Sequence, residues 1–186
     1  MKKILLAVLT VVIANSNLHS QDFRNVSWGM SLSQVKSSEQ IKPIEESSEY
    51  LVYEITLAQF DTYLVYFFTD NNLIRARYVI NENHINVNDY ISDYNILSGF
   101  LQKKYGEPIE EEEKWNSEST FKNDKSFWGH SIRQGDLVLY KTYTSQNTDI
   151  GIWLGSEDYE VLHIIEYSST KPDHKSIEER KILKDF

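Results

Sequence analysis

The sequence contains no cysteine, only three prolines and only seven glycines among its 186 residues. Without cysteine the chain can form no disulfide, carry no lipid on an N-terminal cysteine, use no thiol nucleophile and build no cysteine-ligated zinc site. No two glycines form a Gly-x-Gly pair and none precedes a lysine. The glycine-rich sequence motifs of dinucleotide-binding and phosphate-binding loops are therefore missing. Because the chain also has no disulfide, side-chain packing must stabilise the fold.

Positive charge is also scarce. The chain has 19 lysines and arginines against 28 aspartates and glutamates, a formal net charge of −9. Proteins that bind nucleic acid need clustered lysine and arginine to displace counterions from the phosphates. We therefore expect no nucleic-acid partner.

The first twenty residues differ from the rest of the chain. Lys2 and Lys3 precede an apolar run, Ile4 to Ala14, that only Thr10 interrupts, and short polar residues follow. This is the order of regions in a secretory signal peptide. We expect residues 1–20 to be cleaved between about residues 16 and 21. The product would be exported, periplasmic or extracellular, soluble and more acidic. No later segment is apolar for long enough to cross a membrane as a helix.

Two helices are predicted in the part that follows. Ser31 and Gln34 have the spacing of a capping box and predict a helix from Leu32 to about residue 40. A second helix, from Asp89 to Tyr105, is indicated by an apolar stripe with spacings of three and four residues. Gly106 and Pro108 would end it. The stripe consists of Tyr90, Tyr94, Leu97, Leu101 and Tyr105.

Six strands are predicted as two triplets, each preceded by one of these helices. We infer an α+β fold with antiparallel sheet built from two helix plus three-strand units, about 23–85 and 86–170. Both units would share a single domain over 21–186, since each alone is too small to be stable. Residues 176–186 would form a charged C-terminal helix. The predicted strands cover 50–57, 62–69, 73–80, 136–144, 148–154 and 159–168.

One predicted strand shows which face meets solvent. In 73–80, Ala76, Tyr78 and Ile80 alternate with Arg75 and Arg77. Because successive strand residues point to opposite faces, we expect the two arginines on an exposed face. The same rule places His163 and Glu166 on opposite faces, which rules them out as a metal-binding pair.

Three short segments carry a resemblance. They are Phe23 to Ser31 with Gln34-Val35-Lys36, then Lys104 to Pro108, then Thr148 to Ile150. Together they resemble small exported bacterial proteins of uncharacterised function whose mature part opens with a Trp-Gly-Met-Ser helix start. That resemblance implies an α+β domain with an antiparallel sheet and no catalytic residue set. The repeated unit is also similar in outline to β-lactamase-inhibitor proteins and outer-membrane-assembly lipoproteins, from which the chain departs by lacking cysteine.

Catalytic and metal signatures are weak. The segment Gly129 to Arg133 lacks the second glycine of a nucleophile elbow, and we expect it to continue as a strand. Residues 110–113, all glutamate, lack the alternating ligands of a calcium loop, so we expect a solvated loop. We predict no catalytic residue, metal or cofactor. The least favoured hypothesis is a hydrolase whose active site is assembled from dispersed histidines, acids and hydroxyls.

The four tryptophans are the main functional candidates. We expect Trp28 and Trp153 in the core, whereas Trp115 and Trp128 flank a polar stretch and fit either a core or an exposed platform. The leading hypothesis is a non-enzymatic domain that binds a protein or cell-envelope component through a sheet face or the 109–130 loop. The alternative is a small-ligand or glycan binder using exposed aromatics. The candidate interaction surface comprises Trp115, Trp128, Arg75 and Arg77.

Overall fold

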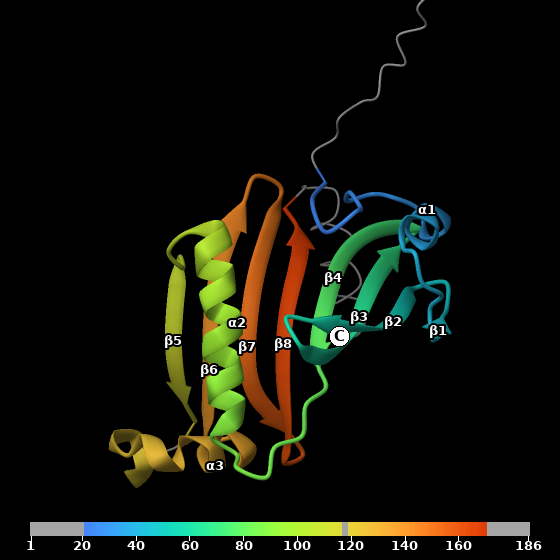
Figure 1. The fold of residues 1–186 in the computed structure, drawn as a ribbon. Coiled ribbons are helices and arrows are strands. Elements are labelled where there is room, and N and C mark those ends of the chain that lie inside the picture. Colours follow the sequence, from blue (N-terminus) through green and yellow to red (C-terminus); the bar gives the residue numbers. More distant parts are fainter. Residues whose placement is uncertain (1–20, 117–118, 171–186) are drawn as a thin grey trace, which may run out of the picture.

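The computed structural model describes residues 21–116 and 119–170 (Figure 1). These residues form one eight-stranded antiparallel sheet with three α-helices, a mixed α+β architecture dominated by sheet. The expected signal peptide and the expected helix at 176–186 lie outside the described residues. In the part of the chain that is described, no helix has the length and apolar character needed to cross a membrane.

The strand order places the two halves of the sequence side by side. From one edge to the other it is β1-β2-β3-β4-β8-β7-β6-β5, so the fourth and the last strands meet at the centre. Tyr78 of β4 pairs with Ile165 of β8, and all neighbouring strands of the described sheet pair antiparallel. The strands are β1 (Glu45–Glu46), β2 (Tyr50–Leu57), β3 (Phe60–Thr69), β4 (Asn72–Ile80), β5 (Glu110–Trp115), β6 (Leu137–Ser145), β7 (Thr148–Glu157) and β8 (Glu160–Ser169).

The helices pack on the sheet at separate places. Helix α2 (Asp89–Tyr105) lies along β6 and β7, as Figure 1 shows, while α3 (Trp128–Arg133) contacts β6, β7 and β8. The short α1 (Leu32–Ser38) contacts β2 and β4. Two 3-10 turns, η1 (Thr120–Asn123) and η2 (Lys125–Phe127), lead into α3.

The predicted helix starts and the end of α2 are confirmed, whereas α1 ends at Ser38, two residues before its predicted end. Ser31 accepts a hydrogen bond from the Gln34 amide, and the Gln34 side chain accepts one from the Ser31 amide, which completes the capping box of α1. Helix α2 spans the predicted residues, and Gly106 follows it with a φ of +88°, a conformation that glycine adopts without strain.

The segment before α1 joins the two halves of the core. The ring of Phe23 packs against Tyr66 and Tyr78 from the first half and Tyr167 from the second, at centroid distances of 5.8, 5.3 and 4.7 Å. The indole of Trp28 is 4 % exposed and donates to the Thr148 hydroxyl at 2.9 Å. Trp28 is therefore a core residue, as predicted.

Two sequence expectations are wrong. Residues 110–113 form strand β5 rather than a loop, because they pair with β6 at the edge of the sheet, where all four carboxylates reach solvent. Gly129 to Arg133 lie in helix α3 rather than in a strand. There the backbone of Gly129 packs so closely on Val87 that a Cβ would lie 2.5 Å from the Val87 carbonyl carbon.

Candidate binding face of the sheet

The two faces of the sheet have different coverings. Side chains such as Leu64, Ala76, Ile152 and Ile165 point to the face that packs on the helices and are buried. The alternate residues of the same strands point to the opposite face, and no helix in the described residues packs there. This second face, which we call the open face, carries partly exposed aromatic and aliphatic side chains such as Tyr140, Trp153 and Ile164.

The strand register aligns the open-face residues in rows across the sheet. One row runs from Arg77 on β4 through Glu166 on β8 and Gly151 on β7 to Thr142 on β6. The neighbouring row consists of Val79, Ile164, Trp153 and Tyr140. A charged row therefore lies directly beside an apolar and aromatic row.

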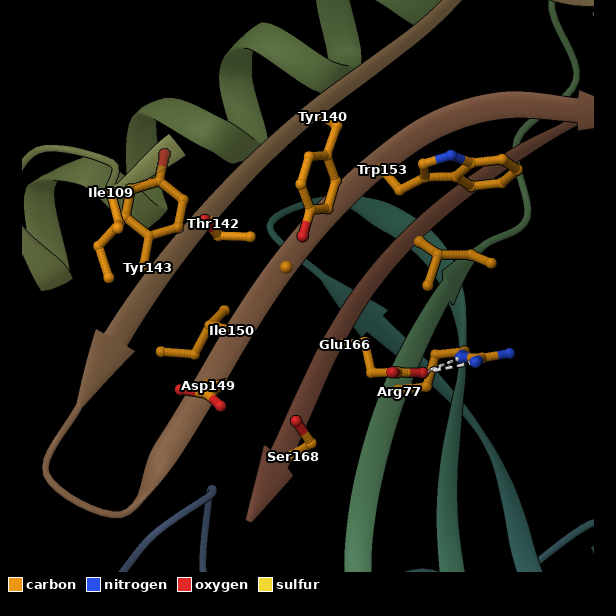
Figure 2. Close-up of a pocket in the computed structure, with 12 residues that line it drawn as sticks. Arg77, Ile109, Tyr140, Thr142, Tyr143, Asp149, Ile150, Trp153, Glu166 and Ser168 are labelled. Carbon is orange, nitrogen blue, oxygen red and sulfur yellow. Dashed lines mark hydrogen bonds and ion pairs between the residues drawn. The ribbon is translucent and has the colours of Figure 1, made fainter. Parts of the chain in front are cut away.

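A hollow of about 540 Å³ lies where these two rows meet. Figure 2 shows Tyr140 and Trp153 on one side of it and the Arg77–Glu166 ion pair on the other. Gly151 lies at the bottom of the hollow and has no side chain to fill it. A Cβ at this position would lie 3.7 Å from the Tyr140 ring. The size is that of a small-molecule site or of a pocket for one or two side chains of a partner.

The charged side of the hollow is held in place by several contacts. Arg77 Nε donates to Glu166 Oε2 at 2.8 Å, and Arg75 Nε lies 3.8 Å from the same oxygen. Both guanidinium groups also lie over the ring of Phe67, at 4.5 Å for Arg75 and 5.4 Å for Arg77. A cation over an aromatic face gains electrostatic stabilisation. The arginines are thus fixed in position on the face.

The hydroxyl of Tyr140 is available as a hydrogen-bond donor at neutral pH. Partial burial raises the pKa of Tyr140, and the nearby carboxylates of Glu110 and Glu112 raise the pKa further. The neutral phenol persists because both causes disfavour the phenolate. A ligand in the hollow would meet an aromatic wall, one phenol donor and an ion pair.

The four predicted interaction residues do not form one surface. Arg75 and Arg77 lie on the open face, as predicted. Trp115 and Trp128 lie on the helix side, where their rings meet edge to face at 6.0 Å. Trp128 is 6 % exposed and its Nε1 donates to the Lys122 carbonyl at 3.2 Å. These two indoles anchor the turns before α3 and do not offer an exposed stacking platform.

Trp153 is the candidate that the sequence interpretation missed. It was expected in the core, but it lies partly exposed on the open face, beside Tyr140 of β6. The alternation of residues in β7 could have predicted this position. Ile150, Ile152 and Leu154 occupy the buried face, so Trp153 must point to the opposite face.

The three described histidines of the predicted mature chain have separate surroundings. His84 pairs with Asp93, His130 is exposed, and His163 is buried with no hydrogen-bond partner for either ring nitrogen among the described residues. The Ser131 hydroxyl is likewise buried without a partner in the described part of the chain. Within the same residues no group of three or more histidines and acids is placed to hold a metal ion. His174 lies outside the described residues.

Comparison with protein-family models, with curated proteins and with solved structures gives no match for this chain.

Proposed function

We propose that the chain is a non-enzymatic binding protein whose open face binds a protein or cell-envelope component. The observation that carries the proposal is the 540 Å³ hollow among Tyr140, Trp153 and the Arg77–Glu166 pair, on a face that no described helix covers. Apolar surface left without a covering layer is typical of interaction sites. Tryptophan, tyrosine and arginine are the residues most enriched in binding hot spots.

The test is a crosslinking pull-down from a cell-envelope extract with matched variants. The double variant Tyr140→Ala/Trp153→Ala removes the aromatic wall, whereas Phe121→Ala removes an exposed aromatic elsewhere, 41 % exposed in η1. We expect a specific partner that the wild type and Phe121→Ala retain and the double variant loses. Equal retention by all three proteins would refute the assignment of the face.

A second candidate function is a small-ligand or glycan binder that uses the same hollow. Its support is the pairing of Trp153 directly opposite Tyr140 across β7 and β6, which presents two aromatic rings together. Aromatic rings and a few polar groups are typical of such sites. Titration with a glycan and metabolite panel should change tryptophan emission in the wild type and leave Trp153→Phe unchanged. No response to any member would argue against this candidate.

We also propose export. Its support is the order of Lys2 and Lys3, the apolar run to Ala14 and the short polar residues after it. The expected destination is the periplasm or the extracellular space, without a lipid anchor. N-terminal sequencing of the product from fractionated cells should find a chain that begins between residues 17 and 21. A product that begins at Met1 in the cytosolic fraction would contradict export.

Finally, we propose that the fold consists of two related units, about 23–85 and 86–170, followed by a charged helix at 176–186; the repeat is similar in outline to that of β-lactamase-inhibitor proteins. In support, α1 precedes β2–β4, α2 precedes β6–β8, and the last strands of the two groups pair with each other. An experimental structure should superpose the two groups on each other. Halves with different helix placement would refute the repeat.

A further inference from the structure

The β2 edge of the sheet is only partly covered (Figure 1). The two residues of β1 pair with Leu51 and Val52, whereas residues 53–57 of β2 have no strand on their outer side in the described chain. The opposite edge, β5, carries four exposed glutamates that discourage pairing. An unpaired strand edge is a template for a further strand, so β2 is the edge at which one can add.

The main-chain groups of Glu54 and Thr56 point out of the sheet. The carbonyls of Tyr50 and Val52 accept hydrogen bonds at 2.9 and 2.8 Å from amides of the segment that contains β1. Because strand residues two apart direct their N–H and C=O groups to the same edge, Glu54 and Thr56 direct theirs outward too. Neither has a main-chain partner on that side among the described residues. Two donors and two acceptors are thus left for an extended chain.

Proline explains why β1 does not continue along this edge. Continued beyond its last pair at Val52, the β1 register would place Pro43 opposite Glu54. Proline has no amide hydrogen, so it cannot donate to the Glu54 carbonyl and the ladder stops. The segment between α1 and β1 leaves β2 here and forms one wall of a groove.

This groove of about 670 Å³ lies beside the outward main-chain groups. Its lining includes Ile55 of β2 and Ile41, a side chain that is 46 % exposed in the segment after α1. The volume is that of a pocket for small molecules or for side chains of a partner. Alternate side chains of an added strand would point to the two faces of the sheet, one set toward Ile55 and the other toward Glu54.

The charge around the groove is negative. Glu39, Glu54 and Asp61 line it, and Arg24 is the one basic side chain among its described lining residues. Arg24 is matched by Glu39, whose two carboxylate oxygens accept from it at 3.3 Å. The carboxylates of Glu54 and Asp61 have no ion-pair partner within residues 21–116 and 119–170. The groove therefore has two uncompensated negative charges.

Charges just outside the groove do not change its sign. Lys42 follows Ile41 along the chain, and Glu82 accepts from the Asp61 amide at 2.8 Å, so these two charges offset each other. A second copy of this chain would bring the same carboxylates to the junction, and like charges facing each other oppose strand pairing. Charge complementarity favours a partner with basic side chains instead.

We infer that the β2 edge binds an extended, basic segment of a partner protein as an added strand. The main chain of that segment pairs with Glu54 and Thr56. Its apolar side chains contact the two isoleucines of the groove, and its lysine or arginine side chains pair with Glu54 and Asp61. In strand addition the main chain supplies affinity and alternate side chains supply specificity. The site is separate from the open-face hollow, which lies on β4, β6, β7 and β8.

The test is a fluorescence anisotropy titration of the full chain with a labelled octapeptide of alternating lysine and valine. A matched peptide with every amide nitrogen methylated keeps the side chains and the charge but cannot donate main-chain hydrogen bonds. We expect saturable binding of the first peptide. The methylated peptide should bind at least about tenfold more weakly, because it loses the main-chain bonds to the edge.

Two variants of β2 and one control locate the site. Glu54→Lys should weaken binding about tenfold, because it reverses one charge of the groove. Glu113→Lys on β5 makes the same change of net charge and should leave the affinity unchanged. Thr56→Pro removes an outward amide and should also weaken binding about tenfold, since main-chain bonds supply the affinity. Proline is tolerated where the amide of an edge strand faces solvent, and circular dichroism with the thermal midpoint establishes that the variant is folded.

Several outcomes would overturn the inference. Equal binding of the two peptides, or equal weakening by Glu54→Lys and Glu113→Lys, would indicate diffuse attraction. A dimer of the full chain that Thr56→Pro dissociates would assign the edge to a second copy. Displacement of the probe by a synthetic peptide of residues 171–186 would assign it to the chain's own end. The Tyr140→Ala/Trp153→Ala variant should retain the probe, so failure of the open-face proposal leaves this test unaffected.

Discussion

The indole of Trp153 lies flat across Gly155, two residues further along the same strand. A Cβ on Gly155 would come within 2.5 Å of Cζ2 of that indole, so no other residue fits beneath the ring. The glycine therefore determines where the aromatic side chain rests. Gly151, two residues before Trp153 on the same face of β7, lines the hollow of the open face together with that indole.

The first prediction concerns this pair. Gly155→Ala should displace the indole and destabilise the protein by about 1–3 kcal/mol, the usual cost of overpacking. Urea unfolding measures the stability, and the tryptophan emission spectrum reports the displacement. The control is Gly99→Ala in α2, where an added Cβ meets nothing within 4 Å. That change should stabilise the helix by about 0.5–1 kcal/mol. Equal behaviour of the two variants would contradict the packing described.

The second prediction concerns acid sensitivity. Burial lowers the pKa of His163 to about 3, so the folded protein keeps the ring neutral while the unfolded chain protonates it near pH 6.5. Between these values the unfolded state binds more protons, and stability must fall as the pH is lowered from about 6.5 toward 3. The effect should amount to a few kcal/mol for a group that is almost fully buried.

His163→Leu should flatten that part of the pH profile. It should cost little at pH 7, because it removes two ring nitrogens that have no hydrogen-bond partner among the described residues. Chemical unfolding at pH 7, 6, 5 and 4 compares the two proteins. An unchanged acid profile in the variant would show that another group is responsible.

The third prediction contrasts two ion pairs. The Glu39 side chain is 3 % exposed and bonded to Arg24, whereas Lys36 and Glu46 form a pair with side chains 43 % and 50 % exposed. Glu39→Gln should destabilise by about 2–4 kcal/mol, because it leaves the partly buried Arg24 without its counter-charge. Glu46→Gln should cost at most about 1 kcal/mol, as is usual for surface pairs. Thermal unfolding of both variants at one pH measures the difference.

The fourth prediction concerns the acidic edge of the sheet. Within the described residues β5 pairs only with β6, and its glutamates protect the other edge from pairing with a second molecule. Replacing Glu110 and Glu112 with threonine should promote self-association at high concentration. Size-exclusion chromatography with light scattering would detect it, and Glu157→Thr at the β7–β8 turn serves as the control. A monomeric double variant would show that the charge is not what protects the edge.

The sequence predicted the elements whose signals are local. Helix α2 is defined by its own apolar stripe and by Gly106, and the alternation of Arg75 and Arg77 with buried residues fixes the face of β4. The prediction left residues 58–61 between two strands, but the turn consists of Ala58 and Gln59 alone, and both adopt positive φ values without the asparagine or glycine that usually signals so tight a turn. Strand β3 therefore begins at Phe60, two residues before the predicted start.

Non-local features could not be read from the sequence. The order of strands places Glu166 beside Arg77, which lies 89 residues earlier, and no local pattern specifies that pairing. Strand β5 was missed for a related reason, because four consecutive glutamates form a strand only when a neighbour such as β6 supplies the hydrogen bonds. Predicting the hollow of the open face would require both the local alternation of residues along each strand and the non-local order of the strands.

The central position of β8 also has a consequence for how the protein folds. Among the described residues it is the last strand along the chain, and β4 and β7 both pair with it. Until residues 160–169 are available, each of those two strands has an unpaired edge, and the two halves of the sheet have no strand contact. Joining distant segments is the slow step in folds of this kind. A chain that stops before β8 should therefore aggregate through two open edges instead of yielding a smaller stable sheet.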